Sequence, residues 1–364
     1  MSFVNFTTMT TTRVSRSESF PFFHLPVELQ LRVLQCDPFA TLLLIRASQS
    51  AKALYLEHPG AVLNAFLNSW PLDLRKLITI ILDIRQGPDR WPELDQVREL
   101  LVEPSSSTLG PLSTEPRTVN TLELLCTLFL DLQIVTELFC KETLYLATCS
   151  FKAPCPDPNE FPYVPVLSTH EQYRINRALL RLIGTWEYVA QSPHPGNKRT
   201  VGRSLLNNFT AWEYEELSTM TAFLGGFCHT DNRRVANTCP KSFLRDCTLL
   251  LSPIELLSAN YISPWPDVVA GSSLIGGGAR YVQNFLLKRE ILTDRFVISF
   301  TLHQSRYYGL ALWDSYRLRS WESLPKNERD AEFFTLPPDG TVEEAKKGCI
   351  DQFEARWKMN QQFL

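Results

Sequence analysis

Glu213, Glu215 and Glu216 place three carboxyl groups within a short stretch of the chain. Grouped carboxylates can serve general acid–base catalysis. The solvated face of a helix, or a helix cap, produces the same cluster, and that structural interpretation is favoured here. The glycine-rich segment 271–278 superficially resembles a phosphate-binding loop, but it lacks the Lys-Ser or Lys-Thr pair that neutralises phosphate and holds magnesium. We therefore predict no catalytic residues.

The nine cysteines are an odd number and are scattered without a regular frame. Such usage is typical of free, buried thiols in a reducing compartment, so we expect an intracellular protein of the cytoplasm or nucleus. The best combination for zinc is Cys228 and His229 with Cys239 and Cys247. It contains no pair of cysteines separated by two residues and no regular spacing. We therefore predict no metal and no other cofactor.

Length and composition predict one large domain or two coupled domains. The chain has 364 residues, of which 44% are hydrophobic and 21% are charged, enough to bury a sizeable core. A net charge of −3 and an isoelectric point near 6.1 leave no electrostatic footprint for nucleic acid. The most apolar stretch, residues 122–139, is interrupted by acidic residues, so no membrane span is expected.

A segment near the N-terminus has the pattern of three short apolar helices. Pro26 suits the first turn of a helix, where its missing N–H costs nothing. Leu25, Leu29 and Val33 are spaced by four residues, and Leu34 lies beside that row. Together these residues predict a helix with a broad apolar stripe.

The second helix of this segment is expected to begin at Pro38, because Asp37 can cap it and proline suits its first position. Leu42 belongs to this nearly all-apolar helix. The third helix carries apolar residues at 51, 54 and 55, and His58 with the following Pro-Gly should end it. From the pattern alone, an ordinary helical hairpin packed onto the rest of the chain is the simplest interpretation.

The same segment resembles an F-box. The similarity lies in Leu25-Pro26, Glu28-Leu29, Val33-Leu34, the Asp37-Pro38 turn, the leucine-rich second helix and Ala47-Ser48. Members of that family bind a Skp-type adaptor, which joins them to a cullin–RING ubiquitin ligase, while the rest of the chain selects a substrate. The resemblance implies a non-catalytic substrate adaptor in which the following residues contact the Skp-type protein: Leu25, Pro26, Leu29, Val33 and Leu34, with Leu42 supporting them.

Two further segments, 173–181 and 209–217, are similar to paired segments in a group of uncharacterised fungal F-box-like proteins. In that group they lie in the helical body downstream of the F-box, and the group has no established substrate, so this resemblance implies a helical body. The protein substrate that the F-box resemblance implies is of unknown identity. We expect Arg177 and Arg181 to pair with glutamates of the second segment at the edge of a shared core, or else to lie beside them on solvated faces. The alternative function is a helical enzyme or small-ligand-binding protein whose N-terminal hairpin is purely structural.

The predicted fold is all-α, with a short three-helix F-box-like module followed by a large irregular helical body. Residues 1–20 are expected to be a disordered tail or, alternatively, a mitochondrial presequence. Residues 21–69 form the module and residues 70–364 the body, with a loop or linker at 104–117.

Apolar periodicity and capping signals set the helices of the body. Ser168 and Glu171 form a capping box, and the tryptophans, Trp313 among them, are expected to pack in the core. Residues 295–302 are the one candidate strand. Helices are predicted at 72–86, 92–103, 119–147, 168–190, 210–224, 241–260, 280–292, 307–323 and 341–360.

Overall fold

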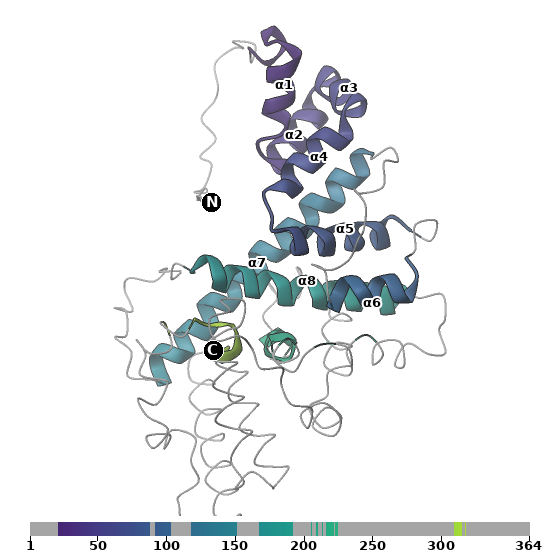
Figure 1. The fold of residues 1–364 in the computed structure, drawn as a ribbon. Helices are drawn as coiled ribbons and strands as arrows, with labels where there is room; N and C mark the ends of the chain where they lie inside the picture. The colour runs from purple at the N-terminus through teal and green to yellow at the C-terminus, as the bar shows by residue number, and fades with distance from the viewer. Residues whose placement is uncertain are drawn as a thin grey trace, which may run out of the picture. The chain divides into compact units, whose positions relative to one another are not determined.

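The computed structural model describes residues 21–87, 92–102, 118–150 and 167–191, with a smaller set at 205, 209, 213, 216–221, 223–224, 309–314 and 317. Regular secondary structure in these residues is helical and none of them lies in a strand, so the all-α prediction is confirmed for this part of the chain (Figure 1). Several predictions lie outside the described residues, namely the tail, the linker, the zinc-type residues, the glycine-rich segment and the candidate strand.

The chain divides into two compact units. The first contains residues 1–70 and 113–126, and the second contains residues 71–112 and 127–364. Residues 113–126, which the sequence analysis assigned to the body, therefore group with the N-terminal residues. Helix α7 (Val119–Ser150) contributes its first residues to the first unit and its remainder to the second.

The first unit is built from short helices that begin at local signals in the sequence. Asp37 Oδ1 accepts a hydrogen bond from the Ala40 N–H at 2.7 Å, and Pro38 takes the first position of the next helix, as predicted. Ser48 caps the third helix in the same way. A fourth helix begins at Pro59 and was not predicted. The elements are η1 (Pro21–His24), α1 (Val27–Leu34), α2 (Pro38–Ala47), α3 (Gln49–Glu57) and α4 (Pro59–Asn68).

Apolar side chains from these elements form the interior of the first unit. The most buried include Phe22, Leu34, Ile45, Ala51, Tyr55, Val62, Leu63 and Leu67. The buried hydroxyl of Thr41 in α2 donates to the Leu34 carbonyl at 2.7 Å. This hydrogen bond joins α2 to the end of α1. The Tyr55 hydroxyl donates to the Thr118 carbonyl at 3.2 Å, just before α7. Apolar burial thus drives the packing of this unit, and a few side-chain hydrogen bonds satisfy the polar groups near helix ends.

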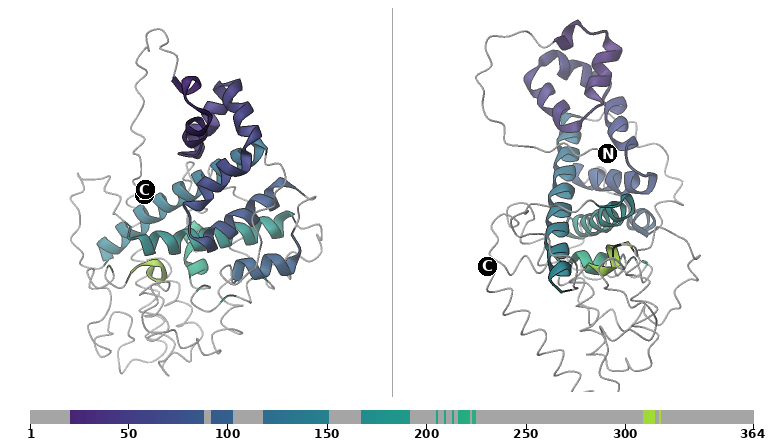
Figure 2. Two further views of the ribbon diagram at one scale, coloured as in Figure 1. Left: turned by 45° about the horizontal axis from the view of Figure 1, so that its top comes forward. Right: turned by 90° about the vertical axis from the view of Figure 1, so that its left-hand side faces the viewer.

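The second unit is organised around α8 (Thr169–Gln191). Helix α5 (Leu72–Gln86) packs along α8, and α6 (Leu94–Val102) packs against both (Figures 1 and 2). A Cβ at Gly184 of α8 would lie 3.2 Å from Leu101 Cδ2 and 3.5 Å from Ile81 Cγ1. The absence of a side chain at Gly184 therefore lets the three helices approach closely.

The predicted helix boundaries in the second unit are close to those observed. Helix α5 has the predicted bounds, whereas α6 begins later than predicted and α7 and α8 end later. The continuous helix predicted at 307–323 is wrong over residues 309–314, where only the short 3-10 helix η6 (Leu310–Leu312) forms, and η6 lies against α8. None of the helices in the described ranges is long and apolar enough to cross a bilayer.

Candidate functional site

The start of α1 forms a fixed turn, which we call the N-terminal corner and define as Leu25, Pro26 and Leu29. The Leu25 N–H donates to the Phe22 carbonyl at 3.2 Å. The Pro26 carbonyl accepts from the N–H groups of Leu29 and Gln30 at 2.9 and 3.0 Å. These bonds begin the helix even though Pro26 has no side chain that can cap it.

The six predicted docking residues fall into an outer and an inner set. Pro26 is exposed, Leu29 is 45% exposed, and Leu25 and Val33 are half-buried. Leu34 and Leu42 are buried in the interior of the first unit. The structure therefore brings Leu25, Pro26 and Leu29 together at one corner, while the two inner leucines can act on this surface only by supporting it.

Other exposed apolar residues in the first unit were missed by the sequence analysis. Phe23 and Val27 are 49% and 51% exposed. Phe22 and Phe23 pack edge to face with ring centroids 5.4 Å apart, and Phe22 is fully buried. The signal for Phe23 was the adjacent pair of aromatic residues, since two neighbours in so tight a turn cannot both point inward.

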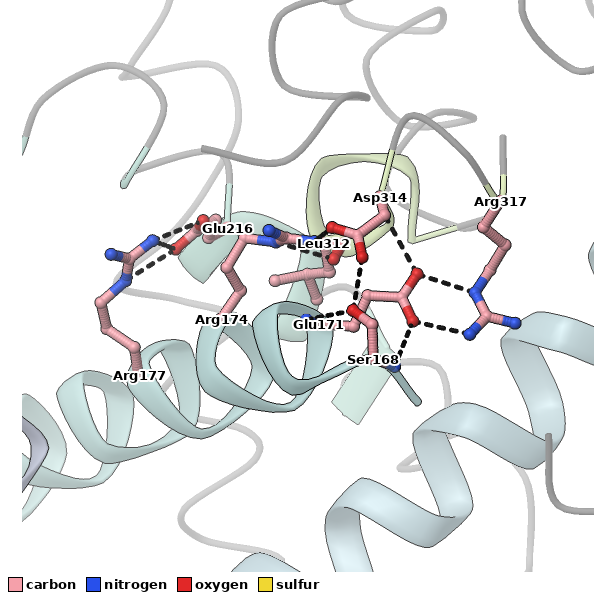
Figure 3. A network of polar contacts seen from close by, with 8 residues as sticks. All are labelled: Ser168, Glu171, Arg174, Arg177, Glu216, Leu312, Asp314 and Arg317. Carbon is pink, nitrogen blue, oxygen red and sulfur yellow. Dashed lines mark hydrogen bonds and ion pairs between the residues drawn. The ribbon is translucent and has the colours of Figure 1, made fainter. Parts of the chain in front are cut away.

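The second unit contains a buried polar network centred on Glu171 (Figure 3). Ser168 and Glu171 form the predicted capping box: the Ser168 N–H donates to Glu171 Oε2 at 3.0 Å and the Glu171 N–H donates to Ser168 Oγ at 3.1 Å. The same carboxylate accepts the Asp314 N–H at 3.0 Å and two guanidinium bonds from Arg317 at 2.7 and 2.6 Å. Each oxygen of Glu171 therefore has two donors.

Three arginines on one face of α8 pair with carboxylates from later in the chain. Arg174 Nη2 lies 2.6 Å from Asp314 Oδ1, and its Nε donates to the Leu312 carbonyl at 2.9 Å. Arg177 makes a bidentate pair with Glu216 at 2.8 and 2.9 Å, with both side chains buried (Figure 3). The spacing of three and four residues is what places such side chains on one helix face.

The remaining pair of this face joins Arg181 Nη2 to Glu213 Oε1 at 2.6 Å. The expectation that Arg177 and Arg181 pair with these glutamates is confirmed, but the pairs are buried and do not lie at an exposed edge. For Glu213 and Glu216 the solvated-face interpretation is therefore wrong. Their charges are taken up by arginines, which leaves them poorly suited to act as free acids or bases.

An aromatic cluster next to η6 packs against the network. Trp313 is fully buried, as predicted, and stacks on Phe139 with a centroid distance of 5.4 Å. The Arg317 guanidinium lies 5.7 Å from the centre of the Trp313 ring. Gly309 has φ +68°, and a Cβ there would lie 2.8 Å from Phe139 Cζ. Residues 309–314 and Arg317 are thus held against α7 and α8 by both aromatic and ionic contacts.

Among the ion pairs of the three α8 arginines, two groups are shifted toward their charged forms and two toward their neutral forms, since burial raises the pKa of Glu216 and lowers the pKa of Arg181. Burial alone would raise the pKa of Asp314, but a hydrogen bond from Ser168 and the Arg174 guanidinium outweigh it, so the pKa is lowered. Burial likewise opposes the charge of Arg177, and the Glu216 carboxylate overcomes this, so the pKa of Arg177 is raised. Buried and paired polar groups of this kind hold chain segments together.

A second ionic group joins α5, α7 and α8 through Arg85. Its Nη2 and Nε donate to Glu187 Oε1 at 2.6 and 2.8 Å, and Asp131 Oδ2 lies 3.9 Å from the same guanidinium. Burial raises the pKa of Asp131 to about 6; Arg85 opposes this rise and Glu187 adds to it. Two carboxylates therefore share one arginine, with Glu187 in the closer contact.

Among the residues that the structure describes, no three His, Cys, Asp or Glu side chains are grouped so that they could hold a metal ion. Comparisons with family models, with curated proteins and with solved structures gave no match. The residues that the structure describes thus offer two features: a set of buried ion pairs inside the second unit, and an exposed apolar corner on the first.

Proposed function

We propose that this chain is a non-catalytic, F-box-type substrate adaptor that works inside the cell. Its first unit binds a Skp-type protein, and through it a cullin–RING ubiquitin ligase. Its helical body presents a protein substrate to that ligase. The proposal is supported by the F-box-like residues of the first unit and by the way those residues are displayed.

The observation that carries the proposal is the unequal burial of the apolar residues along α1. Leu34 at the end of the helix is fully buried, whereas Leu29 is 45% exposed and Val27 is 51% exposed. Pro26 is exposed beside them. An apolar helix start that is not used in the interior of its own unit is typical of a surface that binds a partner.

The test is binding of the purified chain to a recombinant Skp-type adaptor by isothermal titration calorimetry. Leu29→Glu places a charge in the contact and removes an apolar side chain whose burial stabilises a complex by roughly 1.5–3 kcal/mol. We expect the affinity to fall by at least about tenfold. Because Leu29 is partly exposed, the circular dichroism spectrum should stay helical.

Leu130→Glu is the matched control, because Leu130 is also 45% exposed but belongs to the second unit. This variant should bind the adaptor as the parent chain does. A double variant, Leu25→Ala with Pro26→Ala, should lose binding like Leu29→Glu. Absence of binding by the parent chain, or equal losses in Leu29→Glu and Leu130→Glu, would reject the proposal.

A further inference from the structure

The N-terminal corner is held by a side chain that the F-box resemblance does not single out. The Gln30 side-chain amide donates from Nε2 to the Leu25 carbonyl at 2.8 Å, in a part-buried position. Pro26, the residue that precedes α1, makes no side-chain capping bond. Gln30, in the second turn of α1, therefore fixes the backbone just before the helix begins.

This bond completes the backbone hydrogen bonding of Leu25. Its N–H already donates to the Phe22 carbonyl, and its C=O accepts a hydrogen bond from the Gln30 side-chain amide. In many helices an apolar pair across the same positions, before the cap and in the second turn, fixes the entry angle of the chain. Here a hydrogen bond from Gln30 to the Leu25 carbonyl takes the place of that apolar contact. The bond does not involve the Leu25 side chain.

We infer that Gln30 is a positioning residue for partner binding, an inference that rests on the proposed function. Gln30 holds Leu25 and Pro26 in the geometry in which they meet the adaptor. A surface that is already ordered before binding loses less conformational entropy when the complex forms. The bond therefore adds affinity without itself contacting the partner.

Three variants test this role by adaptor affinity and by thermal unfolding. Gln30→Met keeps the length and helix propensity of the side chain but cannot donate, so affinity should fall by about two- to tenfold, the effect of one neutral hydrogen bond. Gln30→Lys retains a donor and should bind within about twofold of the parent. Gln49→Met, at an exposed position of α3, is the matched control and should leave affinity unchanged. Gln30→Lys and Gln49→Met should keep the parent melting temperature, and Gln30→Met should lower it only by the few degrees that correspond to one neutral hydrogen bond.

Hydrogen exchange of the free protein gives a readout that does not depend on the partner. Gln30→Met should speed exchange of the Leu25 and Leu29 amides, while Gln49→Met should not. Unchanged exchange, or an affinity equal to that of the parent, would overturn the inference even if Leu29→Glu abolishes binding. If the parent chain does not bind the adaptor at all, the proposed function fails, and the positioning role in docking fails with it.

Discussion

Removal of Arg177 should cost much more stability than removal of an exposed arginine. In Arg177→Met the Glu216 carboxylate stays buried but loses three guanidinium hydrogen bonds, at 2.8, 2.9 and 3.2 Å. The two side chains are 4% and 1% exposed, so water cannot replace the lost partner. Breaking a buried pair in this way typically costs about 3–5 kcal/mol.

The comparison is with Arg46→Met, which breaks the 2.9 Å pair between Arg46 and Glu123 in the first unit. These side chains are 59% and 40% exposed, and an exposed pair contributes only about 0–1 kcal/mol. Each kcal/mol corresponds to roughly 2–4 °C of melting temperature for a unit as large as the second and to roughly 4–8 °C for one as small as the first. We therefore expect Arg177→Met to lower the melting temperature of the second unit by roughly 6–20 °C and Arg46→Met to lower that of the first by only about 0–8 °C.

Thermal and urea unfolding, followed by circular dichroism, measure both variants. The double variant Arg177→Met with Glu216→Leu removes both charges and should recover most of the loss, because an apolar pair replaces a buried ion pair at little cost. A loss below about 1 kcal/mol in Arg177→Met would refute the reasoning. So would a double variant as unstable as the less stable of the two single variants.

Two further predictions concern Asp131 of the second unit and a pair of glycines, one in each unit. The pKa of Asp131 is raised from 3.8 to about 6, so its stabilising contribution is complete below the unfolded pKa and is lost as pH rises through about 6. Relative to the parent, Asp131→Asn should therefore gain roughly 1–3 kcal/mol of unfolding free energy between about pH 4 and pH 7 in urea titrations, and a constant difference across that range would contradict it. Gly309→Ala should destabilise by roughly 1–3 kcal/mol in thermal unfolding, because φ is +68° and Phe139 lies in the way. Gly60→Ala, where a Cβ meets nothing within 4 Å, should instead stabilise α4 by about 0.5–1 kcal/mol, and equal effects of the two substitutions would count against this explanation.

Local signals explain why parts of the fold could be predicted from the sequence. The caps at Asp37 and at Ser168 depend on residues three positions away, so their chemistry is complete within one helical turn. The start of α4 was missed because Pro59 acts in two ways: it ends α3 and is also well suited to the first position of the next helix.

The partners of Glu171 could not be predicted in the same way. Asp314 and Arg317 are separated from it by 143 and 146 residues, and no periodicity connects positions so far apart. A signal for burial of the α8 arginines did exist. Apolar residues at 175, 178, 179, 180 and 182 surround the helix, which leaves no wide polar face for solvent. The sequence analysis places Arg177 and Arg181 at the edge of a core or on solvated faces, since arginine is rarely buried unless it is paired.

The sequence predicts an apolar stripe at the candidate docking site, but it does not predict which residues of that stripe are exposed. An apolar stripe on α1 does not distinguish a leucine that packs inward from one that faces a partner, because both have the same hydropathy. Only the packed structure separates the buried Leu34 from the exposed Leu29. The Gln30 bond to Leu25 was invisible to pattern analysis because glutamine in a second helical turn is ordinarily an exposed residue.

The division into two units implies that stability and docking can be perturbed separately. Arg177 and Glu216 belong to the second unit, whereas the N-terminal corner belongs to the first. The corner is held by bonds that all lie within the first unit: Phe22 to Leu25, Gln30 to Leu25, and the amides of α1 to Pro26. Arg177→Met should therefore bind the Skp-type adaptor with the parent affinity at temperatures below its own unfolding transition. Leu29→Glu should show the opposite behaviour, with a parent-like melting temperature and lost binding. If Arg177→Met lost adaptor binding while still folded, adaptor binding would depend on the ion pairs of the second unit as well as on the first unit.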